Sequence, residues 1–334
     1  MTASGRTYAP ASAFSRRSLI GGLVACAGLC PLVSGCTTTA PVSALAGAVP
    51  VELTASDDFI VWARLNTGPA VPFKLDTGAG MSALYSDFID LGAVSDPPEM
   101  VEVWGLGGTR LCPVARIGRF EIGGRAYENL PVSVLDQSPP GSSAVGILGM
   151  DILRDWVLEA RTDTGERALY PDSVLNWRRF HAWDRAELIE DPFGMHGFGL
   201  KFGWVKVMGT RVAALVDLGS HLSVMNWEAA RLVPDLDRYW QRAYESWRYY
   251  GAVGNFRVSG TSELFDVSMG SVRWDRVEVI ITDLDSLSLL GSEGHPLMIA
   301  GANMFAGRDF VLHPAGNELR VRGPRRVSPG VVMR

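Results

Sequence analysis

The chain has 334 residues, of which 47% are hydrophobic and 37 are glycine, and its formal net charge is −5 at pH 7. This length can bury one large core or two cores of ordinary domain size. An acidic chain without a run of basic residues is a poor partner for nucleic acid, so a role in binding nucleic acid is excluded.

The first 35 residues have the features of an export signal. Arg16 and Arg17 precede a modestly apolar stretch that glycines and a proline interrupt, and that is too short for a membrane span of roughly 20 residues. Residues 15–20, "SRRSLI", resemble a twin-arginine signal, although an arginine pair also suits the positive start of a Sec signal. Residues 33–36, "VSGC", resemble a lipobox in which Cys36 is acylated and becomes the first residue of the mature protein.

These features predict an exported protein that a lipid on Cys36 anchors to a membrane at the periplasmic side of the cell envelope. By resemblance, Thr37 after this cysteine favours the outer membrane. Residues 36–50 are small and uncharged and are expected to form a tether. Once Cys26 and Cys30 leave with the signal, Cys112 is the one thiol of the folded part, so neither an intramolecular disulfide nor a zinc site of paired cysteines is expected.

From residue 57 onward, short runs of β-branched and aromatic residues alternate with glycine and proline. Typical runs are "FIVWARLN", "VEVWGLGG", "RFEIGGRAYENLPVSVL" and "SVRWDRVEVIITDL". Such spacing is typical of a mostly β structure with tight turns.

Four features of this region occur twice in the same order. "FKLDTGAGMSAL" aligns with "ALVDLGSHLSVM", which places Asp76 opposite Asp217. Each is followed by a glycine-rich hairpin signal, "VWGLGGTR" or "YYGAVGNF", and then by a segment that is typical of a longer hairpin. Finally, "GILGMDILRDWVLEA" aligns with "MIAGANMFAGRDFVLHP", which places Gly149 opposite Gly301.

The repeat predicts two β-rich lobes at residues 51–175 and 195–323. Residues 176–194 connect them, and residues 324–334 form a tail. The connector is more charged and aromatic than a flexible linker, so we expect it to pack across both lobes.

Asp76-Thr77-Gly78-Ala79, the "GLGG" hairpin and "GILG" together resemble the retropepsin-type aspartic protease domain. The duplication resembles the bilobal, pepsin-like arrangement of two such domains in one chain. The resemblance implies a mostly β, bilobal acid protease fold of two retropepsin-like β-barrel lobes with few short helices. It also implies a monomer whose lobes form an intramolecular pseudo-dimer.

The resemblance further implies that Asp76 and Asp217 are a catalytic dyad that hydrolyses peptide bonds through an activated water. Two carboxyl groups a few ångströms apart share one proton, so one can accept a proton from water while the other donates to the substrate carbonyl. This chemistry needs no cofactor and no metal. The residues implied to support the two active loops are Thr77, Gly78, Ala79, Gly219, Ser220, Gly149 and Gly301. Those implied to form flaps over an extended peptide are Trp104, Gly105, Gly107, Gly108 and Gly251.

The second copy departs from the family pattern at Leu218, where a hydroxyl residue usually links the two loops. Leucine cannot donate or accept a hydrogen bond, so we expect a one-sided link. Ser220 fits a position whose hydroxyl can bond a dyad carboxylate, whereas its counterpart Ala79 cannot. Two functions stay open: an aspartic endopeptidase that acts on an envelope protein or peptide, and a non-catalytic peptide-binding or scaffold lipoprotein.

Other hydrolase classes find little support in the sequence. It contains no G-x-S-x-G or H-E-x-x-H motif, and its five histidines form no close metal-ligand pair. His221, four residues after Asp217, is either an ordinary loop residue or one that tunes the second loop electrostatically. The aromatic residues of "DLDRYWQRAYESWRYYG" have helical spacing, and they either pack against the second lobe or form an aromatic wall beside the cleft.

Overall fold

The computed structural model describes residues 47–323, apart from 55–57, 96, 140, 175, 191, 194–197, 244–247, 252 and 284–293. The predicted export signal, Cys36, most of the tether and the tail lie outside the described residues. The described residues belong to one compact unit. No helix among them is long and apolar enough to cross a membrane.

The first lobe is a sheet that closes on itself. Its strands alternate buried and exposed residues, as in "FIVWARL" of β3, so that one face fills a core around Phe73 and Phe120. Pairing of β3 with β8 closes the sheet into a barrel. In sheet order the strands are β2 (Glu52–Leu53), β3 (Phe59–Leu65), β4 (Ala70–Leu75), β10 (Gly146–Leu148), β5 (Ala83–Tyr85), β9 (Arg125–Leu135), β8 (Gly108–Ile122) and β6 (Ala93–Val94), with β7 (Met100–Gly105) paired to β8.

The second lobe has the same strand order. Pairing of β14 with β20 closes it, and the parallel and antiparallel steps follow the same sequence as in the first lobe: β15 and β22 are parallel like β4 and β10, and β16 and β21 are parallel like β5 and β9. In sheet order the strands are β14 (Phe202–Val207), β15 (Thr210–Val216), β22 (Leu297–Ala300), β16 (Ser223–Met225), β21 (Val272–Ile281), β20 (Gly260–Met269) and β17 (Gln241–Arg242).

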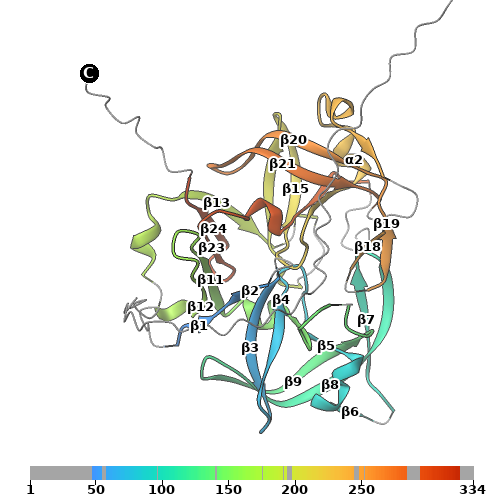
Figure 1. Ribbon diagram of the computed structural model, residues 1–334, viewed down its shortest axis with the longest axis vertical. Helices are drawn as coiled ribbons and strands as arrows, with labels where there is room; N and C mark the ends of the chain where they lie inside the picture. The colour runs from blue at the N-terminus through green and yellow to red at the C-terminus, as the bar shows by residue number, and fades with distance from the viewer. Residues whose placement is uncertain are drawn as a thin grey trace, which may run out of the picture. The chain divides into compact units, whose positions relative to one another are not determined.

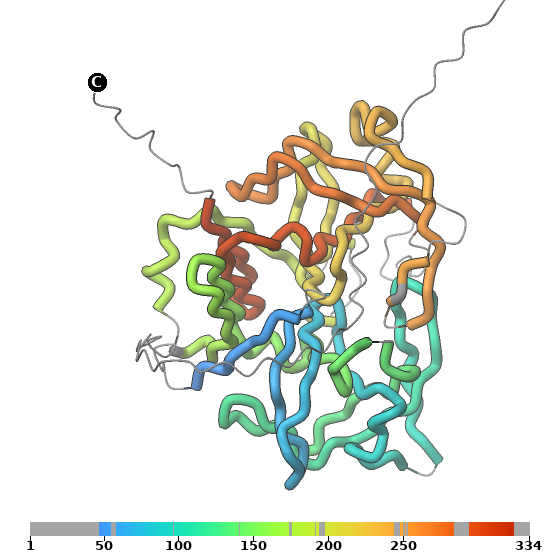
Figure 2. The backbone as a smooth tube through the Cα atoms, in the orientation of Figure 1, coloured from blue at the N-terminus to red at the C-terminus, as the bar shows by residue number. Residues whose placement is uncertain are grey.

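A central sheet joins the two lobes. In it, β11 pairs with β23 across about half the chain, and Figure 1 and Figure 2 show these strands side by side. In order its strands are β1 (Val49–Pro50), β12 (Arg167–Pro171), β11 (Trp156–Ala160), β23 (Phe310–His313), β24 (Glu318–Val321) and β13 (Asp184–Ile189), which continues into β14. Residues 156–171, within the span predicted for the first lobe, therefore lie in a sheet that both lobes share.

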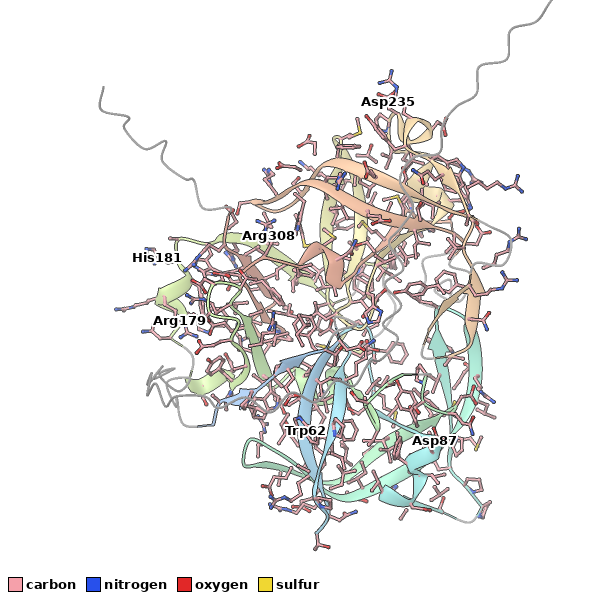
Figure 3. The ribbon with its side chains drawn as sticks, in the orientation of Figure 1. Trp62, Asp87, Arg179, His181, Asp235 and Arg308 are labelled. Carbon is pink, nitrogen blue, oxygen red and sulfur yellow. The ribbon has the colours of Figure 1, made fainter. Side chains whose placement is uncertain are left out.

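The predicted connector packs against this central sheet. Its strand β13 pairs with β24 on one side and with β14 on the other. Arg179, which Figure 3 labels beside His181, forms an ion pair with the buried Glu159 of β11. Arg320 of β24 donates to the carbonyl oxygen of Phe180 at 2.7 Å. The connector is thus part of the folded structure, where it extends the central sheet.

The helices among the described residues are short. They are η1 (Ser86–Leu91), α1 (Met150–Leu153), η2 (Asp172–Val174), η3 (Trp177–Phe180), α2 (Trp227–Ala230), η4 (Leu236–Arg238) and η6 (Ala302–Met304). The aromatic stretch that follows η4 forms β17 and β18 (Arg248–Tyr250), the latter paired with β19 (Asn255–Arg257). Of the four residues with helical spacing, Tyr244 and Trp247 lie outside the described residues, while Tyr239 follows η4 and Trp240 precedes β17.

Candidate active site

Two equivalent loops carry the predicted dyad. The first active loop, residues 76–82, follows β4, and the second, residues 217–223, follows β15. The amide of Asp76 donates to the Leu148 carbonyl at 3.0 Å, and that of Asp217 donates to the Ala300 carbonyl at 3.0 Å. The ends of β10 and β22 thereby fix the start of each loop in the same way.

The two carboxyl groups meet between these loops. The Gly78 amide donates to Asp76 Oδ1 at 2.9 Å, and the Gly219 amide donates to Asp217 Oδ1 at 2.8 Å. The carboxyl groups also lie within hydrogen-bonding distance of each other. One proton shared between them therefore satisfies both groups.

Glycine is required at both positions next to the dyad. A Cβ atom on Gly78 would lie 2.5 Å from Cγ of Asp217, and one on Gly219 would overlap the carboxyl group of Asp76. Each glycine thus leaves the space that the opposite carboxyl group occupies. Both glycines therefore lie between the two active loops, each against the opposite aspartate.

The environments of the two aspartates differ. Burial raises the pKa of Asp76, while the Lys74 ammonium and the backbone amides oppose this rise. Burial also raises the pKa of Asp217, and the negative charge of Asp76 raises it further. Burial thus favours protonation of both groups, and the charge of one disfavours ionisation of the other, so the pair as a whole keeps one proton.

A single threonine links the two loops. Thr77 Oγ1 donates to the Val216 carbonyl at 2.8 Å and accepts from the Leu218 amide at 2.9 Å. Leu218 is buried in the apolar core and offers no hydroxyl in return. The link between the lobes is one-sided, and Thr77 provides both of these bonds.

Sequence reasoning missed the pair that fixes the far end of the first loop. Ser82 Oγ donates to Asp151 Oδ1 at 2.7 Å and accepts from the Gly149 amide at 3.0 Å. A Cβ atom on Gly149 would lie 2.7 Å from the carbonyl carbon of Met81, so the strand passes directly against the loop.

The second lobe repeats this arrangement. Ser223 Oγ donates to Asn303 Oδ1 at 2.8 Å and accepts from the Gly301 amide at 3.1 Å. Each serine lies six residues after its aspartate, and Asp151 and Asn303 each lie two residues after the paired glycine. The alignment of the two copies therefore pairs Ser82 with Ser223 and Asp151 with Asn303, and it could have identified these residues.

The Ser220 hydroxyl does not bond a dyad carboxylate, so that expectation was wrong. Ser220 Oγ donates to the Leu222 carbonyl at 2.8 Å and lies 3.3 Å from Tyr249 Oη. The turn of the loop offers this backbone acceptor to the hydroxyl. It is instead the Ser220 amide that reaches Asp217 Oδ1, at 3.2 Å, and the Ala79 amide serves Asp76 in the same way.

Tyr249 joins the second hairpin to the second active loop. Its hydroxyl oxygen accepts from the His221 amide at 3.1 Å and from the Leu222 amide at 3.3 Å. Other aromatic residues of the same stretch pack on the second lobe: Tyr239 contacts Phe265 with ring centroids 4.6 Å apart. Within this stretch, Tyr239 therefore packs on the second lobe, whereas Tyr249 lies at the second active loop.

The two glycine-rich hairpins touch at their tips. The first hairpin is β7 and β8, and the second is β18 and β19, which Figure 1 shows next to each other. Gly105 packs on Val253, and a Cβ atom on Gly107 would lie 2.5 Å from the amide nitrogen of Asn255. The hairpins therefore meet as a pair.

A cavity of about 640 Å³ lies between the dyad and the hairpins. Trp104, Gly105 and Gly251 line it, whereas Gly107 lies in the turn at the contact between the tips and Gly108 begins β8 opposite Gly105. Its apolar wall includes Tyr85, Leu135, Ile147, Phe198, Leu200, Leu215, Tyr249 and Ile299. The volume and the shape of the lining suit part of an extended peptide.

Among the described residues, no cluster of three or more His, Cys, Asp or Glu side chains could hold a metal ion. Cys112, a free cysteine, is buried on β8, where it packs with apolar neighbours such as Leu135. It contributes to the core of the first lobe.

Residues 61–152 match the family model for aspartyl proteases. A search of curated proteins finds no match. Among solved structures, the chain resembles the aspartic proteinase from Irpex lacteus with a TM-score of 0.53 and 12% identity, over 84% of this chain and 98% of that one.

The structural likeness confirms the prediction of a mostly β, bilobal, pepsin-like fold. The family match covers the first lobe, from β3 through the first active loop to α1. Residues 61–152 are therefore similar to aspartyl protease domains, and the chain as a whole has the fold of an aspartic proteinase.

Proposed function

We propose that the protein is an aspartic endopeptidase that cleaves an extended peptide segment by means of the Asp76 and Asp217 pair. The observation that carries this proposal is the convergence of the two carboxyl groups at one cavity, where each lies against the glycine of the opposite active loop. A pair held in that way can accept and donate a proton in the same step.

The proposed reaction begins with a water molecule between the two carboxyl groups. Ionised Asp76 takes a proton from the water while its oxygen attacks the substrate carbonyl carbon, and Asp217 gives its proton to the carbonyl oxygen. The resulting tetrahedral diol collapses when Asp76 gives its proton to the amide nitrogen, the carbon–nitrogen bond breaks, and one hydroxyl of the diol gives its proton to Asp217 as the new carboxyl group forms. The dyad has then returned to one proton, and no covalent enzyme intermediate forms.

The first hairpin offers a donor to the peptide. Trp104 lines the cavity, and its Nε1 is buried without a hydrogen-bond acceptor among the described residues. Its ring packs edge-on against Phe198 with centroids 5.2 Å apart, which holds the indole in place. A buried donor without a partner costs about 1–3 kcal/mol, so a backbone carbonyl of the peptide would relieve this cost.

A peptide library tests the proposal. We expect the purified protein to cleave a defined subset of peptides, detected by mass spectrometry over pH 3 to 8, and the Asp76→Asn/Asp217→Asn double variant to cleave none. If the intact protein retains peptides on a column but cuts none of them at any pH, the protein is a peptide-binding module instead. Cleavage that survives in the double variant would rule out the dyad.

We also propose that the enzyme acts on an envelope protein or peptide from a lipid anchor at Cys36, because the sequence before residue 47 resembles a lipoprotein signal. The expected result is that labelled palmitate enters the wild-type protein but not a Cys36→Ser variant, and that the wild type sediments with the outer membrane. Equal labelling of both proteins would contradict the anchor.

A further inference from the structure

A charged cluster lies beside the dyad. Lys74 Nζ lies 2.6 Å from Asp58 Oδ1, and His221 Nε2 lies 2.8 Å from the same oxygen. Lys74 is on β4, Asp58 precedes β3 and His221 belongs to the second active loop. The cluster therefore joins the first lobe to the loop that carries Asp217.

The position of Lys74 directs it toward the dyad. Residues two apart on a strand share a face, and Lys74 and Asp76 both line the cavity while Phe73 and Leu75 fill the core. The equivalent residue of the second lobe, two positions before Asp217, is Leu215. Lys74 is one of only three lysines in the sequence, so the two sides of the dyad differ by a charge.

We propose that Lys74, held by Asp58, is a positioning residue that sets the pH range in which the Asp76 and Asp217 pair holds a single proton. The ammonium ion favours the ionised form of either carboxyl group and lowers the pKa of both. The pH at which the pair loses its first proton and the pH at which it loses its second are therefore both lower than they would be without Lys74.

The other charged groups around the cavity do not repeat this role. Among the described residues that line it, Lys74 is the one cation, and Glu102 and Asp136 are anions on the first-lobe side. Arg110 pairs with Asp136. The Tyr85 hydroxyl also faces this region, and its pKa is raised by burial and by the charges of Asp76 and Asp58.

Asp58 keeps the lysine in place and tempers its charge. Burial raises the pKa of Asp58, but hydrogen bonds from His221 and Lys74 outweigh it and hold that pKa well below the usual range. Asp58 therefore stays ionised across the pH range of interest. Its removal would release Lys74 to approach the dyad.

The pH profile of cleavage tests this inference, which in this form rests on the proposed function. In Lys74→Met we expect both limbs of the kcat/KM profile to move up by about one pH unit, because a nearby opposite charge shifts the pKa of a carboxyl group by that order. Asp58→Asn should move both limbs down, and Lys74→Arg should leave them near their wild-type positions. Lys206→Met, which removes an exposed lysine of β14, should not move them. Limbs that stay within about 0.3 unit in Lys74→Met would overturn the proposal.

A second readout does not need cleavage. The dyad holds its proton more tightly in the folded protein, so it stabilises the fold at low pH, and that contribution is lost as the pH rises through the raised pKa. Lys74→Met should enlarge this loss between pH 4 and pH 8, measured by urea unfolding. The enlargement should disappear in an Asp76→Asn/Asp217→Asn background, where the dyad no longer titrates.

The cleavage profile and the unfolding measurement together distinguish a failure of the proposed function from a failure of the proposed role of Lys74. If no peptide is cleaved but the unfolding data show the dyad-dependent effect of Lys74→Met, the proposed function fails and the role of Lys74 stands. If cleavage occurs and Lys74→Met changes neither the limbs nor the pH slope of stability, the role of Lys74 fails and the proposed function stands.

Discussion

Replacing Asp217 by asparagine is expected to abolish peptide cleavage and, at the same time, to stabilise the fold at neutral pH. Asparagine has nearly the same shape, and its amide can still hydrogen-bond to Asp76. It cannot transfer the proton that the substrate carbonyl needs, and loss of general acid catalysis costs on the order of 10² to 10⁴ in rate. Asp76→Asn should lose activity to a similar extent, because no base then remains for the water.

The gain in stability follows from the sign of the pKa shift. Burial and the charge of Asp76 raise the pKa of Asp217 above its ordinary value. Its contribution to folding is present at low pH and is lost as the pH rises through the raised value. The asparagine side chain does not titrate, so the Asp217→Asn variant escapes that loss. The difference in unfolding free energy between the variant and the wild type should therefore grow from pH 4 to pH 8.

Urea unfolding at the two pH values measures this difference, and Asp235→Asn is the matched control. Asp235 is exposed at the end of the second lobe, labelled in Figure 3, and its left-handed φ of 55° suits asparagine. This control should keep wild-type cleavage and show no growing difference. A wild type that is as stable relative to Asp217→Asn at pH 8 as at pH 4 would contradict the raised pKa.

The features that sequence predicted are those that local pattern determines. Each aspartate motif is a short local pattern of a strand, an aspartate and a glycine. Because the pattern occurs at both Asp76 and Asp217, each copy supports the interpretation of the other. Ser82 and Ser223 were present in the same alignment but were missed, because a serine in a loop is common. Lys74 against Leu215 was a visible difference whose meaning needed the fold, since only the strand face shows that Lys74 shares the cavity with Asp76.

What could not be predicted depends on contacts between distant segments. The pairing of β11 with β23 joins residues about 150 positions apart and requires both lobes to be formed. The meeting of the hairpin tips, and the Tyr249 hydroxyl on the second loop, likewise depend on how the hairpins fold over the cavity. In the aromatic stretch, the pairing of β17 with β20 likewise could not be predicted, because a strand of two residues leaves no periodic pattern in the sequence.

Thr77→Val is expected to destabilise the interface between the loops strongly. Valine keeps the shape of threonine but leaves the Leu218 amide and the Val216 carbonyl without their partner. Each buried group left unpaired costs about 1–3 kcal/mol, so we expect a loss of about 2–5 kcal/mol in unfolding free energy. If residue 218 also carried a hydroxyl, half of the hydrogen bonds between the two active loops would survive this change. Leu218 has no hydroxyl and cannot replace the bonds that Thr77 loses.

Catalysis should fall together with stability, because the same bonds hold the two aspartates opposite each other. Thr77→Ser keeps the hydroxyl and should retain most of the stability and activity, which separates the hydrogen bonds from the loss of a methyl group. Thr210→Val removes an exposed hydroxyl that donates to the Leu232 carbonyl at 3.0 Å, and it should cost less than about 1 kcal/mol. Urea unfolding and kcat/KM of the three variants decide the matter: if Thr77→Val matches Thr77→Ser in both, the lobes are aligned by the central sheet alone and Leu218 is no handicap.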